Sequence, residues 1–261
     1  MATPEKYINI DRLEKTYASP RGPVKALEAI SLDIAQHEFV SVLGPSGCGK
    51  STLLKCLAAL EGISGGSISI GGVPVAGPPE NMGIVFQRDV LLDWRTVLDN
   101  VLITAEFRDL PRASYVARAM QLLRLFGLEE FANRFPWELS GGMRQRASIC
   151  RALLVDPELL LMDEPFGALD AMTRDELNLE LQRMWTETRK TVLFITHSIT
   201  EAVYLSDRVV MMSRNPGRIA EIISIDLPRP RALSVRETPE FGRYTAHIRE
   251  IFTAMGILKD G

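Results

Sequence analysis

The sequence predicts an α/β protein built around a doubly wound parallel sheet. Three short apolar runs, at residues 39–43, 159–162 and 192–195, each end at a polar or glycine-rich element. Runs of this length that are rich in branched side chains are typical of strands buried on both faces of a parallel sheet. The alternation of strands and helices favours a single α/β core. The segments with helical spacing are residues 50–60, 143–154 and 173–188.

Two further features flank this core. Residues 68–75 contain two short strands separated by Gly71 and Gly72, a pattern typical of a β-hairpin. Residues 89–138 have helical spacing and no strand-like run, which favours a helical insert. We therefore expect a small antiparallel sheet beside the core and a helical subdomain at about residues 89–150.

The last part of the chain differs from the core. Leu227–Arg231 contains two prolines, which break regular structure, and we expect it to be a linker. We place the domain boundary before this linker, with one domain at 1–218 and a C-terminal linker and tail at 219–261. The tail has an apolar stripe at helical spacing, which predicts an amphipathic helix that docks on the protein's own surface. The stripe consists of Phe241, Tyr244, Ile248, Ile251, Phe252 and Met255.

Composition narrows the class of protein. The chain has 261 residues, 46% of them hydrophobic, and a net charge of −3, so it lacks the basic character expected of a nucleic-acid binder. No apolar run approaches the roughly 18 to 20 residues that cross a bilayer, and the N-terminus does not resemble a signal peptide. We expect a cytoplasmic protein. Its three cysteines suit a reducing compartment, and we expect Cys56 and Cys150 to be buried thiols but Cys48 to be accessible to thiol reagents.

A glycine-rich segment follows the first buried strand and opens a helix, which is the context that a phosphate-binding P-loop requires. Its glycines allow backbone N–H groups to turn towards phosphate oxygens, and the helix N-terminus adds partial positive charge. We expect Lys50 to contact the terminal phosphates and the Ser51 hydroxyl to contact Mg²⁺. The segment predicts a P-loop NTPase core of the RecA-like type. Its residues are Gly44, Pro45, Ser46, Gly47, Cys48, Gly49, Lys50, Ser51 and Thr52.

Two acids, Asp163 and Glu164, directly follow the apolar run at 159–162. Neighbouring residues at a strand end point to opposite sides, so the two carboxylates can have different tasks. We expect Asp163 to lie in the Mg²⁺ shell and Glu164 to polarise the water that attacks the γ-phosphate.

A second glycine-containing segment, Leu139 to Arg146, precedes another predicted helix. Ser140, Gly141 and Gly142 at a helix N-terminus would form a second anion-binding site. This segment resembles the signature motif of ATP-binding-cassette (ABC) ATPases, although Met143 stands where the family usually has glutamine. The resemblance covers about residues 7–218. It implies ATP as cofactor with Mg²⁺, and a head-to-tail dimer in which each signature faces the ATP of the second copy.

Four other positions match that family's pattern in chain order. Tyr17 resembles the aromatic residue that stacks on adenine, and Gln87 resembles the glutamine that joins Mg²⁺ and the attacking water to the membrane partner. The run Ala168-Leu169-Asp170 resembles the loop that links the two sites across the dimer. His197 resembles the switch histidine that touches the γ-phosphate.

The sequence resembles the importer branch for nitrate, sulfonates and taurine at Met143, Asn215–Arg218 and Leu227–Arg231. That branch implies transmembrane permease subunits, an indirect partnership with a solute-binding protein, and a peripheral position on the cytoplasmic face of the inner membrane. The apolar residues that follow Gln87 would then contact the permease. They are Val90, Leu91, Leu92 and Trp94.

Two other classes of protein remain open at this point: a non-transport ABC ATPase and a P-loop small-molecule kinase. A non-transport ABC ATPase of the repair or chromosome type would carry a long coiled coil, whereas Lys50 and Ser140 are only 90 positions apart. Translation factors of the family usually hold two cassettes, and this chain has one. A P-loop small-molecule kinase would leave the signature and His197 unexplained.

Overall fold

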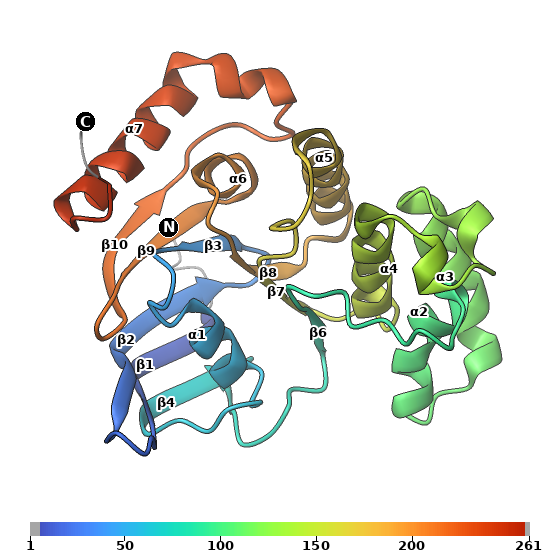
Figure 1. Ribbon diagram of the computed structural model, residues 1–261, viewed down its shortest axis with the longest axis horizontal. Coiled ribbons are helices and arrows are strands. Elements are labelled where there is room, and N and C mark those ends of the chain that lie inside the picture. Colours follow the sequence, from blue (N-terminus) through green and yellow to red (C-terminus); the bar gives the residue numbers. More distant parts are fainter. Residues whose placement is uncertain (1–5, 259–261) are drawn as a thin grey trace. The chain divides into compact units, whose positions relative to one another are not determined.

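The computed structural model describes residues 6–258, which form two compact units (Figure 1). One unit contains the described residues up to 80 together with those from 189 onwards. The other contains residues 81–188. None of the described helices is long and apolar enough to cross a membrane.

The first unit contains an antiparallel sheet. Ile8, Ile10 and Leu13 of β1 are buried, as expected for strands with one face on a core. Gly71 and Gly72 both have positive φ, which is the conformation that a tight two-residue hairpin turn requires and confirms the predicted hairpin. The strand order is β2 (Val24–Ala35), β1 (Lys6–Tyr17), β4 (Gly65–Ile70) and β5 (Val73–Pro74).

The same unit holds four strands of a second sheet. β3 lies between β8 and β9 and is parallel to both, and all of its residues are buried, as the apolar run predicts. Helix α6 packs against β3. The strand order in this unit is β10 (Arg218–Ser224), β9 (Arg208–Ser213), β3 (Phe39–Leu43) and β8 (Thr191–Ile195). The helices are α1 (Lys50–Leu57), α6 (Ile199–Leu205), the short η3 (Leu233–Glu237) and α7 (Pro239–Ala254).

Helix α1 ends earlier than the sequence pattern predicts, at Leu57 instead of residue 60. Ala59 has a φ of 52°, in the left-handed region, and its N–H bonds back to the carbonyl of Cys56. This local closure ends the helix although the apolar pattern continues to Leu60.

The proline-rich segment Leu227–Arg231 forms no helix or strand, and it is held against the protein. Arg231 is only 2% exposed, and its guanidinium donates hydrogen bonds of 2.9 Å to the carbonyls of Val203, Tyr204 and Ser206. Burial, together with the charge of Arg229, lowers the pKa of Arg231 to about 10. The segment is therefore anchored to the carbonyl groups at the end of α6.

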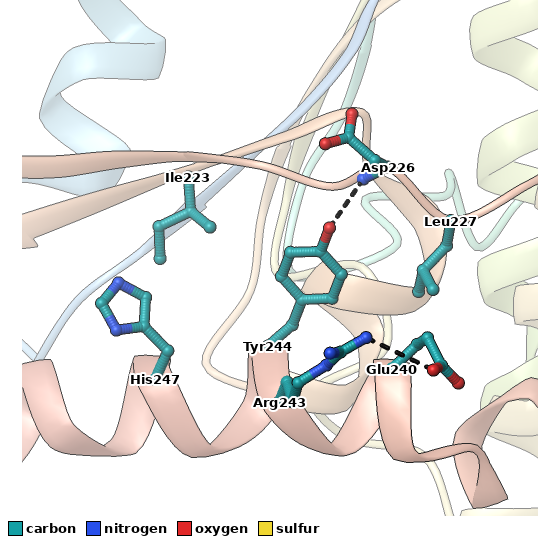
Figure 2. A pocket seen from close by; sticks show the side chains of 7 residues that line it. All are labelled: Ile223, Asp226, Leu227, Glu240, Arg243, Tyr244 and His247. Atoms are coloured by element: carbon teal, nitrogen blue, oxygen red, sulfur yellow. Dashed lines mark hydrogen bonds and ion pairs between the residues drawn. The ribbon is translucent and has the colours of Figure 1, made fainter.

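Helix α7 docks on its own unit, as predicted. Phe241, Ile248 and Phe252 are buried and the helix contacts α6. The Tyr244 hydroxyl accepts a 3.0 Å hydrogen bond from the Asp226 N–H (Figure 2). A hollow of about 490 Å³ remains beside this bond. It is lined by Ile223, Asp226, Leu227, Glu240, Arg243, Tyr244 and His247.

The second unit is mainly helical and contains one parallel strand pair. The strands β6 (Met82–Val85) and β7 (Leu159–Asp163) pair in register. Gly83 lies against α4, since a Cβ there would be 2.5 Å from the Ala152 carbonyl oxygen. The predicted helical insert is confirmed. The unit's helices are α2 (Val97–Phe107), α3 (Arg112–Leu125), the short η1 (Glu129–Phe131) and η2 (Pro136–Glu138), α4 (Gly141–Leu153) and α5 (Ala171–Thr188).

Candidate nucleotide site

The glycine-rich loop joins β3 to α1 with the geometry of a P-loop. Gly47 and Gly49 have φ values of 77° and 95°, in the left-handed region that favours glycine. A Cβ at Gly44 would lie 2.7 Å from the Cys48 Sγ, and one at Gly49 would lie 2.6 Å from Leu27. The loop therefore needs glycine at these positions, and Ser46 and Gly47 at its tip are exposed.

Lys50 points back into this loop. Its side chain donates hydrogen bonds to the carbonyl oxygens of Gly44 (2.8 Å) and Pro45 (3.1 Å), and the residue is 6% exposed. Helix α1 has no acidic residue in its first turn and no side-chain cap at Gly49. The positive end of the helix is thus not neutralised locally, and together with Lys50 it suits a polyphosphate. Ser51 and Thr52 stand half-buried in this first turn.

The predicted accessibility of Cys48 is wrong. The residue is 1% exposed although it lies in the phosphate loop. Its sulfur packs close to Gly44, and its carbonyl lies against Gly217, where a Cβ would be only 2.1 Å away. The loop backbone thus turns the thiol into the protein. Cys56 and Cys150 are buried as predicted.

His197 and Tyr17 belong to the same unit as the loop. His197 is exposed two residues after the end of β8, and β8 is a parallel neighbour of β3, so the loop and His197 lie at the same edge of the sheet. That edge, outside the carboxyl ends of parallel strands, is where α/β proteins bind ligands. Tyr17 is half-buried at the end of β1, and the Lys15 ammonium lies 4.6 Å from the centre of its ring.

Gln87 and Glu164 are brought together in the second unit. Gln87 follows β6 and Glu164 follows β7, and the Gln87 Nε2 donates a 3.3 Å hydrogen bond to the Glu164 Oε2. Glu164 has a φ of 45°, a left-handed conformation that is uncommon for a residue with a side chain. Asp163, the last residue of β7, is half-buried beside it.

The signature segment forms the N-terminus of α4. Ser140 is the N-cap, and its hydroxyl accepts a 3.2 Å hydrogen bond from the Met143 N–H. The helix therefore begins at Gly141, two residues before the predicted start. Gly141 is exposed, whereas a Cβ at Gly142 would lie 2.6 Å from Thr173. The first turn contains no acidic residue, so the helix terminus is free to receive an anion.

Asp170 caps the following helix. Its carboxylate accepts hydrogen bonds from the Thr173 N–H (3.0 Å) and the Thr173 hydroxyl (2.7 Å). The backbone hydrogen bond, followed by the hydroxyl, lowers the pKa of Asp170. The side chain is thus an anionic cap at the start of α5.

Sequence reasoning missed the residues that shape the segment after Gln87. The buried side chain of Asn100 donates to the carbonyls of Leu92, Arg95 and Thr96 and accepts from the Leu92 N–H. Two arginines of α4 hold the start of the segment. Arg144 pairs with Asp89 at 2.9 Å, and Arg151 donates to the Asp89 and Val90 carbonyls at 2.7 Å. A polar residue within an apolar helical pattern was the only signal for Asn100.

A phosphate loop after one buried strand, with an acidic pair after another, defines a P-loop nucleotide-hydrolysing protein. The helix terminus at Ser140, with Gly141 exposed and no acidic residue in the first turn, has the features of a second anion site. The family description "ABC transporter" matches residues 27–167. The chain belongs to the ABC transporter family and is an ATP-binding-cassette ATPase.

Relatives of this family match most of the chain. The taurine import ATP-binding protein TauB of Rhizobium johnstonii is 45% identical over 94% of this chain and 95% of its own length. The aliphatic sulfonates import ATP-binding protein SsuB of Bacillus cereus is 43% identical over 86% and 88%. A dimeric structure of the bacterial ABC transporter cassette MJ0796 matches with a TM-score of 0.76 and 31% identity, covering 85% of this chain and all of that one. The same cassette in a post-hydrolysis state, bound to ADP and Pi, matches with a TM-score of 0.74.

Proposed function

We propose that this chain is the ATP-binding and ATP-hydrolysing subunit of an importer for a small sulfonate or a similar anion. The observation that carries the proposal is the presence of two glycine-rich anion sites on one chain, the loop that ends at Lys50 and the α4 terminus at Ser140. Relatives named as import ATP-binding proteins match nearly the whole chain, which favours a transport role over a non-transport ABC ATPase.

In this proposal the P-loop and Lys50 bind the phosphates of ATP, and Tyr17 stacks on the adenine. The donor set supports Mg²⁺, because this ion prefers a few oxygen ligands together with phosphate and water. The Ser51 hydroxyl, the Asp163 carboxylate and the Gln87 amide oxygen would hold it. When bound, Mg²⁺ neutralises charge that develops on the phosphate oxygens.

The chain's own residues then perform the chemical step. Glu164 accepts a proton from the attacking water, and its hydrogen bond with Gln87 orients the carboxylate. His197 contacts the γ-phosphate from the edge of the sheet that also carries the P-loop. Glu164 has a left-handed backbone whereas Asp163 is the last residue of strand β7, and this difference in backbone conformation supports separate roles for the two acids.

Dimerisation and membrane coupling complete the proposal. Ser140, Gly141 and Gly142 bind the ATP held by a second copy, with Asp170 at the link between the two sites, and dimeric cassettes among the similar structures support this arrangement. Val90 and Trp94 are 54% and 73% exposed. Both would contact the permease, which is a separate protein from this chain. The protein would then lie peripherally on the cytoplasmic face of the membrane, with a solute-binding protein as indirect partner.

The test is reconstitution of the chain with a permease and a solute-binding protein, if the genes beside its own encode them. We expect taurine or an alkanesulfonate, presented by the binding protein, to stimulate ATP hydrolysis in proteoliposomes and to accumulate inside vesicles. Nitrate is the comparison solute, and a Glu164→Gln subunit is the inactive control. ATP hydrolysis that responds to DNA or ribosomes instead of the permease would contradict the transport role.

A further inference from the structure

Two aromatic side chains stack on each other directly before helix α4. The rings of Phe135 and Trp137 have centroids 4.6 Å apart and an interplanar angle of only 4°. Trp137 is nevertheless 64% exposed, so one face of this stack lies in solvent. A single exposed apolar side chain is ordinary, but a stacked pair presents a flat and already ordered apolar surface.

The backbone around the stack is held in place by polar contacts. The Glu138 carboxylate accepts a 2.7 Å hydrogen bond from the Phe135 N–H and pairs with Arg134 at 3.0 Å. Pro136 is buried at the start of the short helix η2, whose second residue is Trp137. Because the turn is fixed, covering Trp137 would cost little additional ordering.

The stack lies next to the signature terminus. Trp137 precedes the N-cap Ser140 by three residues, and a chain spans at most about 3.6 Å per residue, so their Cα atoms are within about 11 Å. Leu139 links them in an extended conformation, and the Arg144 guanidinium donates a 2.7 Å hydrogen bond to its carbonyl. A large molecule that seats against the α4 terminus therefore comes within reach of the indole.

We propose that the Phe135–Trp137 stack is part of the interface with a second copy of this chain and is covered when the ATP-bound dimer closes. The inference rests on the proposed function, in which the α4 terminus meets nucleotide held by the second copy. Its support is continuity with that interface, since the stack and Ser140 belong to one braced segment. Tryptophan in a water-excluded contact is also the residue type most often found to dominate interface energies.

The chain allows a direct optical test. Its tryptophans are Trp94, Trp137 and Trp185, and Trp185 is 2% exposed. In a protein with Trp94→Phe and Glu164→Gln, the change in acrylamide quenching on adding ATP and Mg²⁺ reports on Trp137. We expect quenching of this emission to fall severalfold, in proportion to the dimer fraction measured by light scattering over a range of protein concentrations. The same protein with Trp137→Phe is the control and should lack the change.

A second measurement does not depend on fluorescence. With Glu164→Gln present, Trp137→Ala should raise the dimer dissociation constant about tenfold or more. Binding of ATP to the monomer should stay unchanged, and Phe107→Ala, at an 80% exposed position at the end of α2, should leave dimerisation intact. Circular dichroism of the Trp137→Ala protein checks that it is folded.

Four outcomes would overturn the inference. A dimer that forms while Trp137 stays as quenchable as in the monomer would remove the stack from the interface. Protection that is independent of protein concentration would mean that Trp137 contacts nucleotide on its own chain, and protection that requires the permease would make the permease its partner. Absence of any ATP-dependent dimer would instead reject the dimer of the proposed function, and the inference with it.

Discussion

The Gln87 side-chain amide donates a hydrogen bond to the Glu164 carboxylate, 3.3 Å away. The two residues are far apart in sequence but follow the parallel neighbours β6 and β7, so the sheet register places them at one edge. The contact joins the acid proposed to activate water to the start of the segment proposed to contact the permease. Movement of that segment and the position of the carboxylate are thereby connected through one side chain.

Replacing Glu164 with glutamine should nearly stop hydrolysis. The amide preserves the shape of the carboxylate but cannot accept a proton, and loss of a general base typically costs about 10²- to 10⁴-fold. ATP binding should persist, so an ATP-bound dimer should accumulate, which size measurement with ATP and Mg²⁺ detects. Glu187→Gln, a half-exposed position on α5, is the matched control. A Glu164→Gln protein that remains monomeric and hydrolyses ATP at the parental rate would refute the assignment.

Lys50→Ala should weaken ATP binding itself. The ammonium is buried against the loop carbonyls, and a hydrogen bond to a charged group contributes about 1.5–3 kcal/mol, equivalent to roughly 10- to 100-fold in affinity. Fluorescent ATP titration measures the loss. Lys55→Ala, in the last turn of the same helix, is the matched control and should bind ATP normally. Tight binding by the Lys50 variant would exclude its phosphate role.

Local patterns predicted the strand, phosphate loop and helix around Lys50, because each depends on neighbours in sequence. The anchoring of Arg231 was not predictable, since its partners are backbone carbonyls, among them those of Val203, Tyr204 and Ser206, which no side-chain pattern marks. The same holds for Asn100, whose partners are also carbonyls. Burial of Cys48 follows from the loop's backbone and not from its residue type. The strands and loops could thus be predicted, whereas contacts to distant backbone groups could not.

Cys48 should resist bulky thiol reagents in the native protein. It is 1% exposed, as is Cys56, and a reagent needs access to the sulfur. We expect mass mapping of the nucleotide-free protein to find little modification of Cys48, and full modification only after denaturation. Burial raises the pKa of the Cys56 thiol, so Cys56 serves as an internal control for a slow site. Rapid labelling of Cys48 that ATP prevents would mean that the loop opens in solution.

The contact between α7 and β10 should make stability depend on pH. The His247 ring bonds to Glu221 at 2.6 Å, and this bond raises the pKa of His247, with Glu250 at 3.8 Å adding to the effect. A raised histidine pKa contributes stability that is fully present below about pH 6.5 and is lost as the pH rises through the folded-state value. Because both side chains are partly exposed, the contribution should stay below about 1 kcal/mol.

The measurement for His247 compares melting temperatures of the parent and His247→Gln at pH 5.5 and pH 8.5. The parent should be more stable at pH 5.5, and the difference should shrink at pH 8.5. Arg243→Gln, which removes a neighbouring exposed cation on the same helix, should show no such pH trend. An equal difference at both pH values would show that the ion pair does not contribute.

The last prediction concerns the apolar segment after Gln87. Val90 and Trp94 are 54% and 73% exposed, whereas Leu91 and Leu92 are half-buried. The carbonyls of the segment are held by Asn100, so the exposed side chains project from an ordered loop, as an interface anchor requires.

Trp94→Ala should therefore change the stability of the free subunit by no more than about 0.5 kcal/mol, the usual range for a surface substitution. ATP hydrolysis by the free subunit should stay unchanged. Recovery of the permease by co-purification should fall about tenfold or more, and transport should be lost. Val73→Ala, at a 67% exposed position in the hairpin, is the matched control.

Leu92→Asp is a less specific probe of the permease contact, because Leu92 is half-buried and its N–H bonds to Asn100. Asn100→Ala should lower the melting temperature, because it removes the side-chain hydrogen bonds to the Leu92, Arg95 and Thr96 carbonyls and from the Leu92 N–H, and should also weaken assembly. Normal assembly by both Trp94→Ala and Asn100→Ala would place the permease contact elsewhere on the subunit.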